Sequence, residues 1–221
     1  MSFVEQCVQD SLPIWEQCLN TEFLRGLADG TLAEDCFKGY IVDDSLYLRE
    51  YARVFAWGMT RADTMEEMRF YTSMLSFVNE KEDATRLVYL KGWGLSDATL
   101  QSLPQRPENR AYTEHMIRAA QSGGAPECMM AVLTCMLSYR WLFRAILDKN
   151  PAVLEGRFAP LVRDYTAPYC DSMCSDWVEK TDRLCADLPE ARKARCLEIF
   201  RESSLHELYF WQMSARPRDD V

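Results

Sequence analysis

Apolar residues recur at helical spacing along nearly the whole chain, and no segment sustains the alternation of a half-buried strand. This feature constrains the fold most, because amphipathic helices must bury their apolar faces against one another. Break signals such as Asp29-Gly30, Gly123-Gly124 and Asn150-Pro151 separate the periodic segments. The pattern predicts helices over residues 3–18, 20–29, 33–61, 64–93, 107–122, 125–148, 157–186 and 189–214.

Two local signals refine this prediction. Pro13 lies inside the first helix, where we expect it to kink or divide the helix. Ser96-Asp97 is expected to cap a short turn in the weakly patterned connection over residues 94–107. No internal repeat or Ser/Gly linker interrupts the chain. The sequence therefore predicts an all-α fold, a compact multi-helix bundle in which residues 1–221 form one domain.

The net charge and the cysteine content predict which partners the protein binds and in which cellular compartment it resides. The net charge of −9 over 221 residues disfavours nucleic acid as a partner. Nine cysteines without a C-x-x-C pair favour free thiols in a reducing cytoplasm, and two histidines argue against a His-rich metal site. The apolar run Cys128–Leu133 ends at Thr134, so no membrane span or membrane partner is expected. We expect no metal or other cofactor.

Asp44 is the first candidate functional residue. It projects between an apolar stripe and a row of tyrosines on the helix expected over residues 33–61, so its carboxylate should face the interior. The alternative is a structural aspartate satisfied by a tyrosine or an arginine. Asp43 points about a quarter-turn away and is expected near the surface. The stripe and the row contain Phe37, Ile41, Leu48 and Phe55, and Tyr40, Tyr47 and Tyr51.

Cys135 and Glu207 are the other two candidates. Cys135 lies in an apolar line that continues to Tyr139, where a cysteine more often packs than reacts. Glu207 lies among inward aromatic residues, so its pKa should be raised and it could move protons near neutrality. A structural salt bridge is the alternative for Glu207. Its neighbour His206 is interpreted as a surface or satisfied histidine.

Together these residues predict an enclosed polar pocket between helices. A thiolate can add to a ring carbon, one carboxylate can bind the ring by hydrogen bonds, and a second can shuttle protons. Aromatic side chains would stack on a flat heterocycle. The chain contains no G-x-G-x-x-G, G-x-S-x-G or H-E-x-x-H motif, which disfavours the enzyme classes that use them.

Three motifs resemble a known family in the right order. They are the segment EFLRGLADGTLAEDCFKGYIVDDSLYL, the pair Cys135 and Tyr139, and the C-terminal Glu207-x-x-Phe210-Trp211. Weaker matches run from Pro107 to Tyr112 and over Asp164-Tyr165. The sequence resembles the TenA family, the thiaminase II or aminopyrimidine aminohydrolase proteins.

The resemblance implies a fold, an activity and a set of roles. The fold would be a heme-oxygenase-like bundle that binds no heme and assembles as a homotetramer. The activity would be hydrolysis of aminomethylpyrimidine or thiamin to hydroxymethylpyrimidine in thiamin salvage. Cys135 would be the nucleophile, Glu207 the acid/base, and Asp44 the carboxylate that binds the aminopyrimidine edge. The residues that would orient the ring or stack on it are Tyr47, Tyr112, Tyr139, Tyr165 and Phe210.

Some positions depart from the family pattern and leave the preferred substrate open. Asp43 replaces a glutamine, Thr134 a proline, and Leu161 a tryptophan. Two other functions remain possible on the same residues. One is a non-catalytic module that holds a pyrimidine or another heterocycle. The other is heme or cofactor oxidation on the same fold, which the two histidines disfavour because neither lies on a convincing inward stripe.

Overall fold

The computed structural model describes residues 1–75, 78 and 84–221. Within these residues it contains helices and no strand, which confirms the predicted all-α class. The elements are α1 Phe3–Leu19, α2 Glu22–Asp29, α3 Glu34–Thr60, α4 Met65–Met74, α5 Thr85–Gly92, α6 Asp97–Ser102, α7 Pro107–Ser122, α8 Ala125–Lys149, the 3₁₀ helix η2 Pro151–Glu155, α9 Ala159–Thr166, α10 Pro168–Cys185 and α11 Glu190–Ser214.

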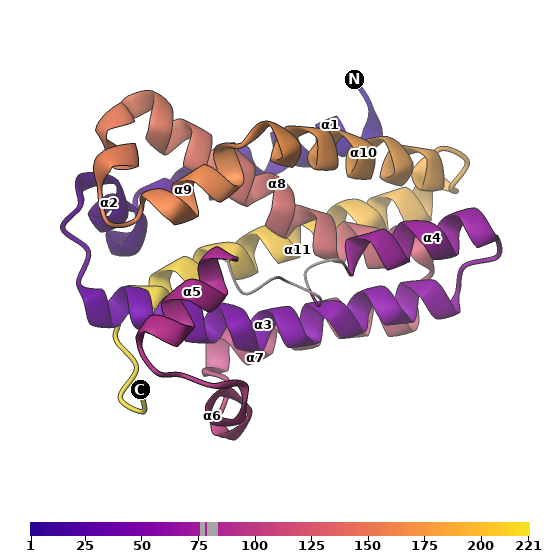
Figure 1. Ribbon diagram of the computed structural model, residues 1–221. Coiled ribbons are helices and arrows are strands. Elements are labelled where there is room, and N and C mark those ends of the chain that lie inside the picture. Colours follow the sequence, from indigo (N-terminus) through magenta and orange to yellow (C-terminus); the bar gives the residue numbers. More distant parts are fainter. Residues whose placement is uncertain (76–77, 79–83) are drawn as a thin grey trace.

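The long helices lie roughly side by side, and α8 and α11 occupy the middle of the bundle (Figure 1). Helix α11 packs against α8, α1 and α7, while α3 packs against α7 and α8. Helix α10 covers α8 on the side opposite α3, and the C-terminal tail returns beside the first turns of α3. This arrangement places the inward faces of α3, α7, α8 and α11 around one interior region.

Helix α8 is long and apolar enough to pass a test for a membrane-spanning segment, with a mean hydropathy of 1.3 over its best window. In that window, 61% of the residues are buried inside the protein. The long helices α1, α3, α7, α10 and α11 pack around α8, together with α9 and η2. Its apolar character is therefore explained by its place at the centre of the core.

Two predicted helices are each split in the structure. The segment predicted over 64–93 forms α4 and α5, and residues 76–77 and 79–83 between them lie outside the described residues. The segment predicted over 157–186 ends at Thr166 and restarts at Pro168. Ala167 is extended there, with φ −69° and ψ 149°, because the proline ring disfavours a helical residue before it.

Of the kink or division predicted at Pro13, the division does not occur, since α1 continues through this residue. Pro13 has no backbone N–H, so the helix lacks one hydrogen bond at this point. Buried residues including Ile14 and Trp15 pack α1 against α11, and this packing keeps the helix continuous. The short turn predicted after Ser96 is confirmed as α6, and the Ser96 hydroxyl accepts a bond from the Thr99 N–H at 3.2 Å.

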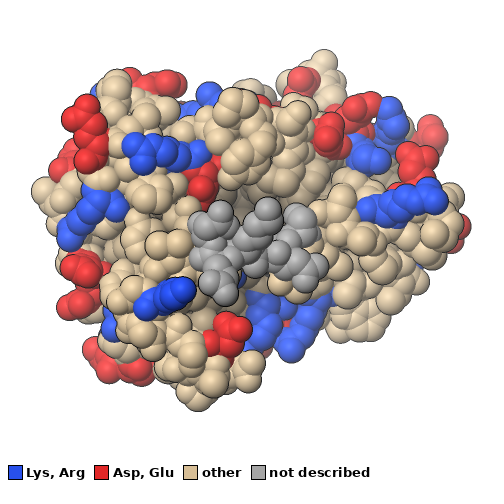
Figure 2. Space-filling model, viewed as in Figure 1, with Lys and Arg blue, Asp and Glu red and all other residues tan. Residues whose placement is uncertain are grey.

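Charged side chains of both signs are interspersed over the face shown in Figure 2. Basic residues do not merge there into the broad stripe that a nucleic-acid backbone requires.

Candidate active site

A cavity of about 490 Å³ opens between α3, α8, α9 and α10. Asp44, Cys135 and Tyr165 line it, so three residues that are far apart in the sequence share one cavity. Much of the remaining wall is apolar and includes the flexible side chains of Met136 and Met173 from these helices and of Met74 from α4, while α5 adds further lining residues. A cavity of this size and lining suits a small flat molecule with few polar groups.

Glu207 lies behind this cavity and is only 1% exposed. The Tyr112 hydroxyl of α7 donates a hydrogen bond to Glu207 Oε1 at 2.7 Å. The Glu207 carboxyl and the Tyr47 hydroxyl of α3 both influence the pKa of the Cys135 thiol of α8, which indicates that these groups lie near one another. Four helices therefore each contribute one polar group to a single cluster, which is buried except where Cys135 lines the cavity.

Burial sets the protonation of this cluster. Loss of solvent raises the pKa of Glu207 from 4.5 to about 8, and the charge of Asp44 adds to the rise. Hydrogen bonds from Tyr112 and Cys135 act in the opposite direction but do not cancel the effect. Burial, followed by the Glu207 charge, also raises the pKa of the Cys135 thiol well above its usual value. Glu207 is therefore poised to give or take a proton near neutral pH.

Aromatic rings form the wall behind the cavity. Tyr47 stacks on Tyr51 with ring centroids 5.3 Å apart, and it lies 5.1 Å from Tyr112 and 6.1 Å from Phe210. Tyr139 lies 4.9 Å from Tyr165. Of the five aromatic residues predicted to orient the ring, Tyr165 lines the cavity. The other four are no more than 3% exposed and support the lining from behind; they are Tyr47, Tyr112, Tyr139 and Phe210.

Several cavity residues were not predicted from the sequence. Tyr51 and Trp177 add aromatic surface, and Arg86 and Asp164 add charge. Tyr51 had a signal, because it follows Tyr47 by one helical turn in the same row. Trp177 lies on a helix whose break was missed, so its face could not be assigned.

Two departures from the family pattern have a structural explanation. Thr134 is fully buried, and its hydroxyl lies 3.3 Å from the Phe200 carbonyl oxygen, which ties α8 to α11 beside Cys135. Leu161 lines the cavity, where it presents a smaller side chain than a tryptophan would.

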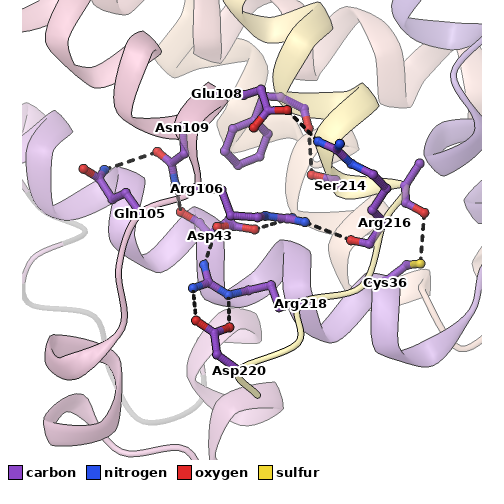
Figure 3. Close-up of polar contacts among 12 residues, drawn as sticks. Cys36, Asp43, Gln105, Arg106, Glu108, Asn109, Ser214, Arg216, Arg218 and Asp220 are labelled. Atoms are coloured by element: carbon purple, nitrogen blue, oxygen red, sulfur yellow. Dashed lines mark hydrogen bonds and ion pairs between the residues drawn. The ribbon is translucent and has the colours of Figure 1, made fainter.

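The prediction that Asp43 lies near the surface is wrong. Its side chain is completely buried between the guanidinium groups of Arg106 and Arg218 (Figure 3). The C-terminal tail covers this part of α3, and helical periodicity within α3 carries no information about a distant segment that folds over it.

The placement of the histidines also needs correction. His115 is 6% exposed, and its Nε2 lies 3.0 Å from the Ser203 hydroxyl. His206 is half-buried and stacks on Tyr112 at 5.3 Å with an interplanar angle of 8°. Burial lowers the pKa of both histidines to about 4, so both are neutral at pH 7.

Neither histidine lines the cavity. Among residues 1–75, 78 and 84–221, no three His, Cys, Asp or Glu side chains are grouped so that they could hold a metal ion.

Known proteins resemble this chain over nearly its full length. The model of the TENA/THI-4/PQQC family matches residues 8–217. An aminopyrimidine aminohydrolase of Halalkalibacterium halodurans is 28% identical, and the match covers 99% of this chain and 97% of that protein. An aminopyrimidine aminohydrolase of Bacillus subtilis is 27% identical over 98% of this chain and 91% of its own.

Solved structures share the fold. A TenA family transcription regulator from a Silicibacter species superposes with a TM-score of 0.85 at 22% identity, covering 97% of both chains. A TenA homologue from P. horikoshii superposes with a TM-score of 0.83, also at 22% identity, covering 98% of this chain and 99% of that one.

Proposed function

The chain belongs to the TENA/THI-4/PQQC family, and we propose that it is an aminopyrimidine aminohydrolase of thiamin salvage. Its substrate would be aminomethylpyrimidine or thiamin, and its product hydroxymethylpyrimidine. The observation that carries the proposal is the cavity that Asp44 and Cys135 both line, with the buried Tyr112–Glu207 hydrogen bond behind it. The relatives named aminopyrimidine aminohydrolase support the same reaction class.

Substrate binding would use both the carboxylate and the apolar wall of the cavity. The Asp44 carboxylate accepts hydrogen bonds from the amino edge of the pyrimidine, while Tyr165 and the apolar wall contact the ring faces. Cys135 then lies beside a ring carbon. The wall behind the lining keeps the reacting groups away from bulk water, which strengthens their electrostatic interactions.

In the first half of the reaction, the Cys135 sulfur bonds to a ring carbon and the displaced electron pair moves to a ring nitrogen. The thiol proton moves to the same ring nitrogen. Glu207, which burial keeps protonated near neutrality, gives its proton to the departing amine as the C–N bond at the methylene carbon breaks.

In the second half, water replaces the amine. The Glu207 carboxylate takes a proton from water as the oxygen bonds to the methylene carbon. The S–C bond then breaks, the sulfur takes its proton back from the ring nitrogen, and the ring recovers its aromaticity. The net change is the replacement of an amine by a hydroxyl group with consumption of one water.

A product assay tests this function. Purified protein is incubated with aminomethylpyrimidine and with thiamin, and hydroxymethylpyrimidine is measured. Cys135→Ala should abolish turnover while ligand binding stays measurable. Cys128→Ala removes a buried thiol from the same helix outside the cavity and is the matched control. Tight binding without product in the unaltered protein would instead indicate a non-catalytic heterocycle-binding module.

The cytoplasmic location and the homotetramer expected from the sequence belong to the same proposal. Light scattering coupled to size-exclusion chromatography measures the oligomeric state directly.

A further inference from the structure

The carboxylate of Asp43 is the centre of a buried ionic cluster next to the candidate active site (Figure 3). Arg218 Nη1 lies 2.6 Å from Asp43 Oδ1, and Arg106 forms an ion pair with the other oxygen. The side chain of Asp43 is 0% exposed and that of Arg218 is 2% exposed. Burying two such groups is unfavourable unless each is well paired, and here Arg218 also pairs with Asp220 at 2.8 Å.

The cluster fastens the C-terminal tail across α3. Arg218 Nη2 donates to the Pro104 carbonyl oxygen at 2.8 Å, and Arg106 donates to the Arg216 carbonyl oxygen at 2.9 Å. Gly39 permits the close approach, because a Cβ at that position would lie 3.3 Å from the backbone nitrogen and the Cγ of Arg218. The tail therefore fits against one particular face of α3.

The backbone of Asp43 is held as well. The fully buried Asn109 side chain of α7 donates a hydrogen bond to the Asp43 carbonyl oxygen at 2.8 Å. Both the side chain and the main chain of Asp43 are thus fixed immediately before Asp44. Asn109 also lies one turn before Tyr112 on α7.

The same cluster reaches three of the four helices that carry the polar groups of the site, α3, α7 and α11. Asp43 precedes Asp44 on α3, and Arg106 is the residue before α7, which carries Tyr112. Arg218 belongs to the tail that directly follows α11, which carries Glu207. A change in the cluster would therefore alter how these three helices are positioned relative to one another.

We propose that Asp43 and Arg218 are positioning residues that fix the Asp44 carboxylate and the Tyr112–Glu207 pair in their reactive geometry. The proposal rests on the aminopyrimidine hydrolase function proposed above. It also accounts for a second carboxylate beside Asp44, since the two arginines neutralise Asp43 and direct it away from the cavity. A small misplacement of such groups can lower a reaction rate by as much as about 100-fold.

Three variants test this role. Arg218→Gln removes the charge that pairs with Asp43, and Arg218→Lys restores the charge without the planar group that reaches Asp43, Asp220 and Pro104 together. Arg216→Gln is the matched control, because it removes an exposed arginine of the same tail whose side chain pairs only with Glu108 among the described contacts. All kinetics are measured well below the melting temperature of each variant.

The kinetic readout separates positioning from simple support of the fold. We expect Arg218→Gln to lower kcat/KM about 10- to 100-fold, with part of the loss in KM because Asp44 binds substrate. Arg218→Lys should recover part of the loss, and Arg216→Gln should match the unaltered protein. The alkaline limb of the pH profile should move to higher pH in Arg218→Gln, because a weaker bond from Tyr112 lets the pKa of Glu207 rise further.

A second measurement does not depend on activity. Amide hydrogen exchange over residues 40–47 and 109–115 should be faster in Arg218→Gln than in Arg216→Gln. If the unaltered protein turns over no aminopyrimidine, the proposed function fails and the exchange data alone decide the positioning role. The role is overturned if Arg218→Gln only lowers the melting temperature and leaves kcat, KM, the pH profile and local exchange unchanged.

Discussion

The raised pKa of Glu207 predicts a specific dependence of stability on pH. In the unfolded chain this carboxyl titrates near 4.5, whereas in the folded protein burial moves its pKa to about 8. Between pH 4.5 and pH 8, the folded protein therefore keeps the Glu207 proton, whereas the unfolded chain has released it. The contribution of Glu207 to the free energy of unfolding is fully present below pH 4.5, declines as pH rises, and is lost above pH 8. Because Glu207 is only 1% exposed, solvent screening reduces the effect little.

The size of this effect follows from the shift. Each pKa unit corresponds to about 1.36 kcal/mol, so the stability attributable to Glu207 should fall by about 5 kcal/mol between pH 4.5 and pH 8. Glu207→Gln keeps an oxygen that can accept the Tyr112 bond and removes the titration. We expect the variant and the unaltered protein to be similarly stable at pH 5, and the variant to be more stable at pH 9.

Urea unfolding under reducing conditions at pH 5, 7 and 9 measures the difference in free energy of unfolding. Glu198→Gln, an exposed position on the same helix, controls for the loss of a carboxylate from α11. The free energy of unfolding of Glu207→Gln is compared with that of the unaltered protein at each pH. If their difference stays constant from pH 5 to pH 9, burial does not keep Glu207 protonated. The expected gain in stability should accompany a loss of turnover, since Gln cannot transfer a proton.

Three further predictions follow from the neighbours of Glu207 and from the ionic cluster. Tyr112→Phe should move the alkaline limb of kcat/KM upward by about one to two pH units, because a hydrogen bond to a charged group is worth about 1.5–3 kcal/mol; an unmoved limb contradicts this. The buried histidines should destabilise the fold as pH falls from 6.5 towards 4, and thermal unfolding of His206→Phe should show less of that loss than the unaltered protein. Asp43→Asn should lower the free energy of unfolding by about 3–5 kcal/mol, because among the described contacts it leaves Arg106 without an anionic partner and Arg218 with Asp220 alone; urea unfolding at pH 7 that differs by less than about 1 kcal/mol would refute that role.

The part of the site that could be predicted depends only on the sequence pattern within single helices. Asp44, Cys135 and Glu207 each break an apolar face at helical spacing, and such a residue must point inward whatever the neighbouring helix is. The bundle class followed from the same periodicity.

What could not be predicted depends on contacts between distant segments. Asp43 has the same local pattern whether it is solvated or covered, and only the fold of the tail places Arg218 against it. His206 likewise gained its partner Tyr112 from another helix. The break before Pro168 was missed although the proline was visible, because apolar periodicity continues on both sides of it.

The methionines of the cavity have a consequence for substrate choice. Met74, Met136 and Met173 are unbranched and rotate easily, so this part of the wall can take up different shapes at small energetic cost. Asp44 and Glu207, in contrast, lie on α3 and α11, two long helices that each pack against several others. For the proposed aminopyrimidine substrates, we therefore expect discrimination to depend on the pyrimidine ring, while the methionine side of the cavity accommodates attached groups of different size.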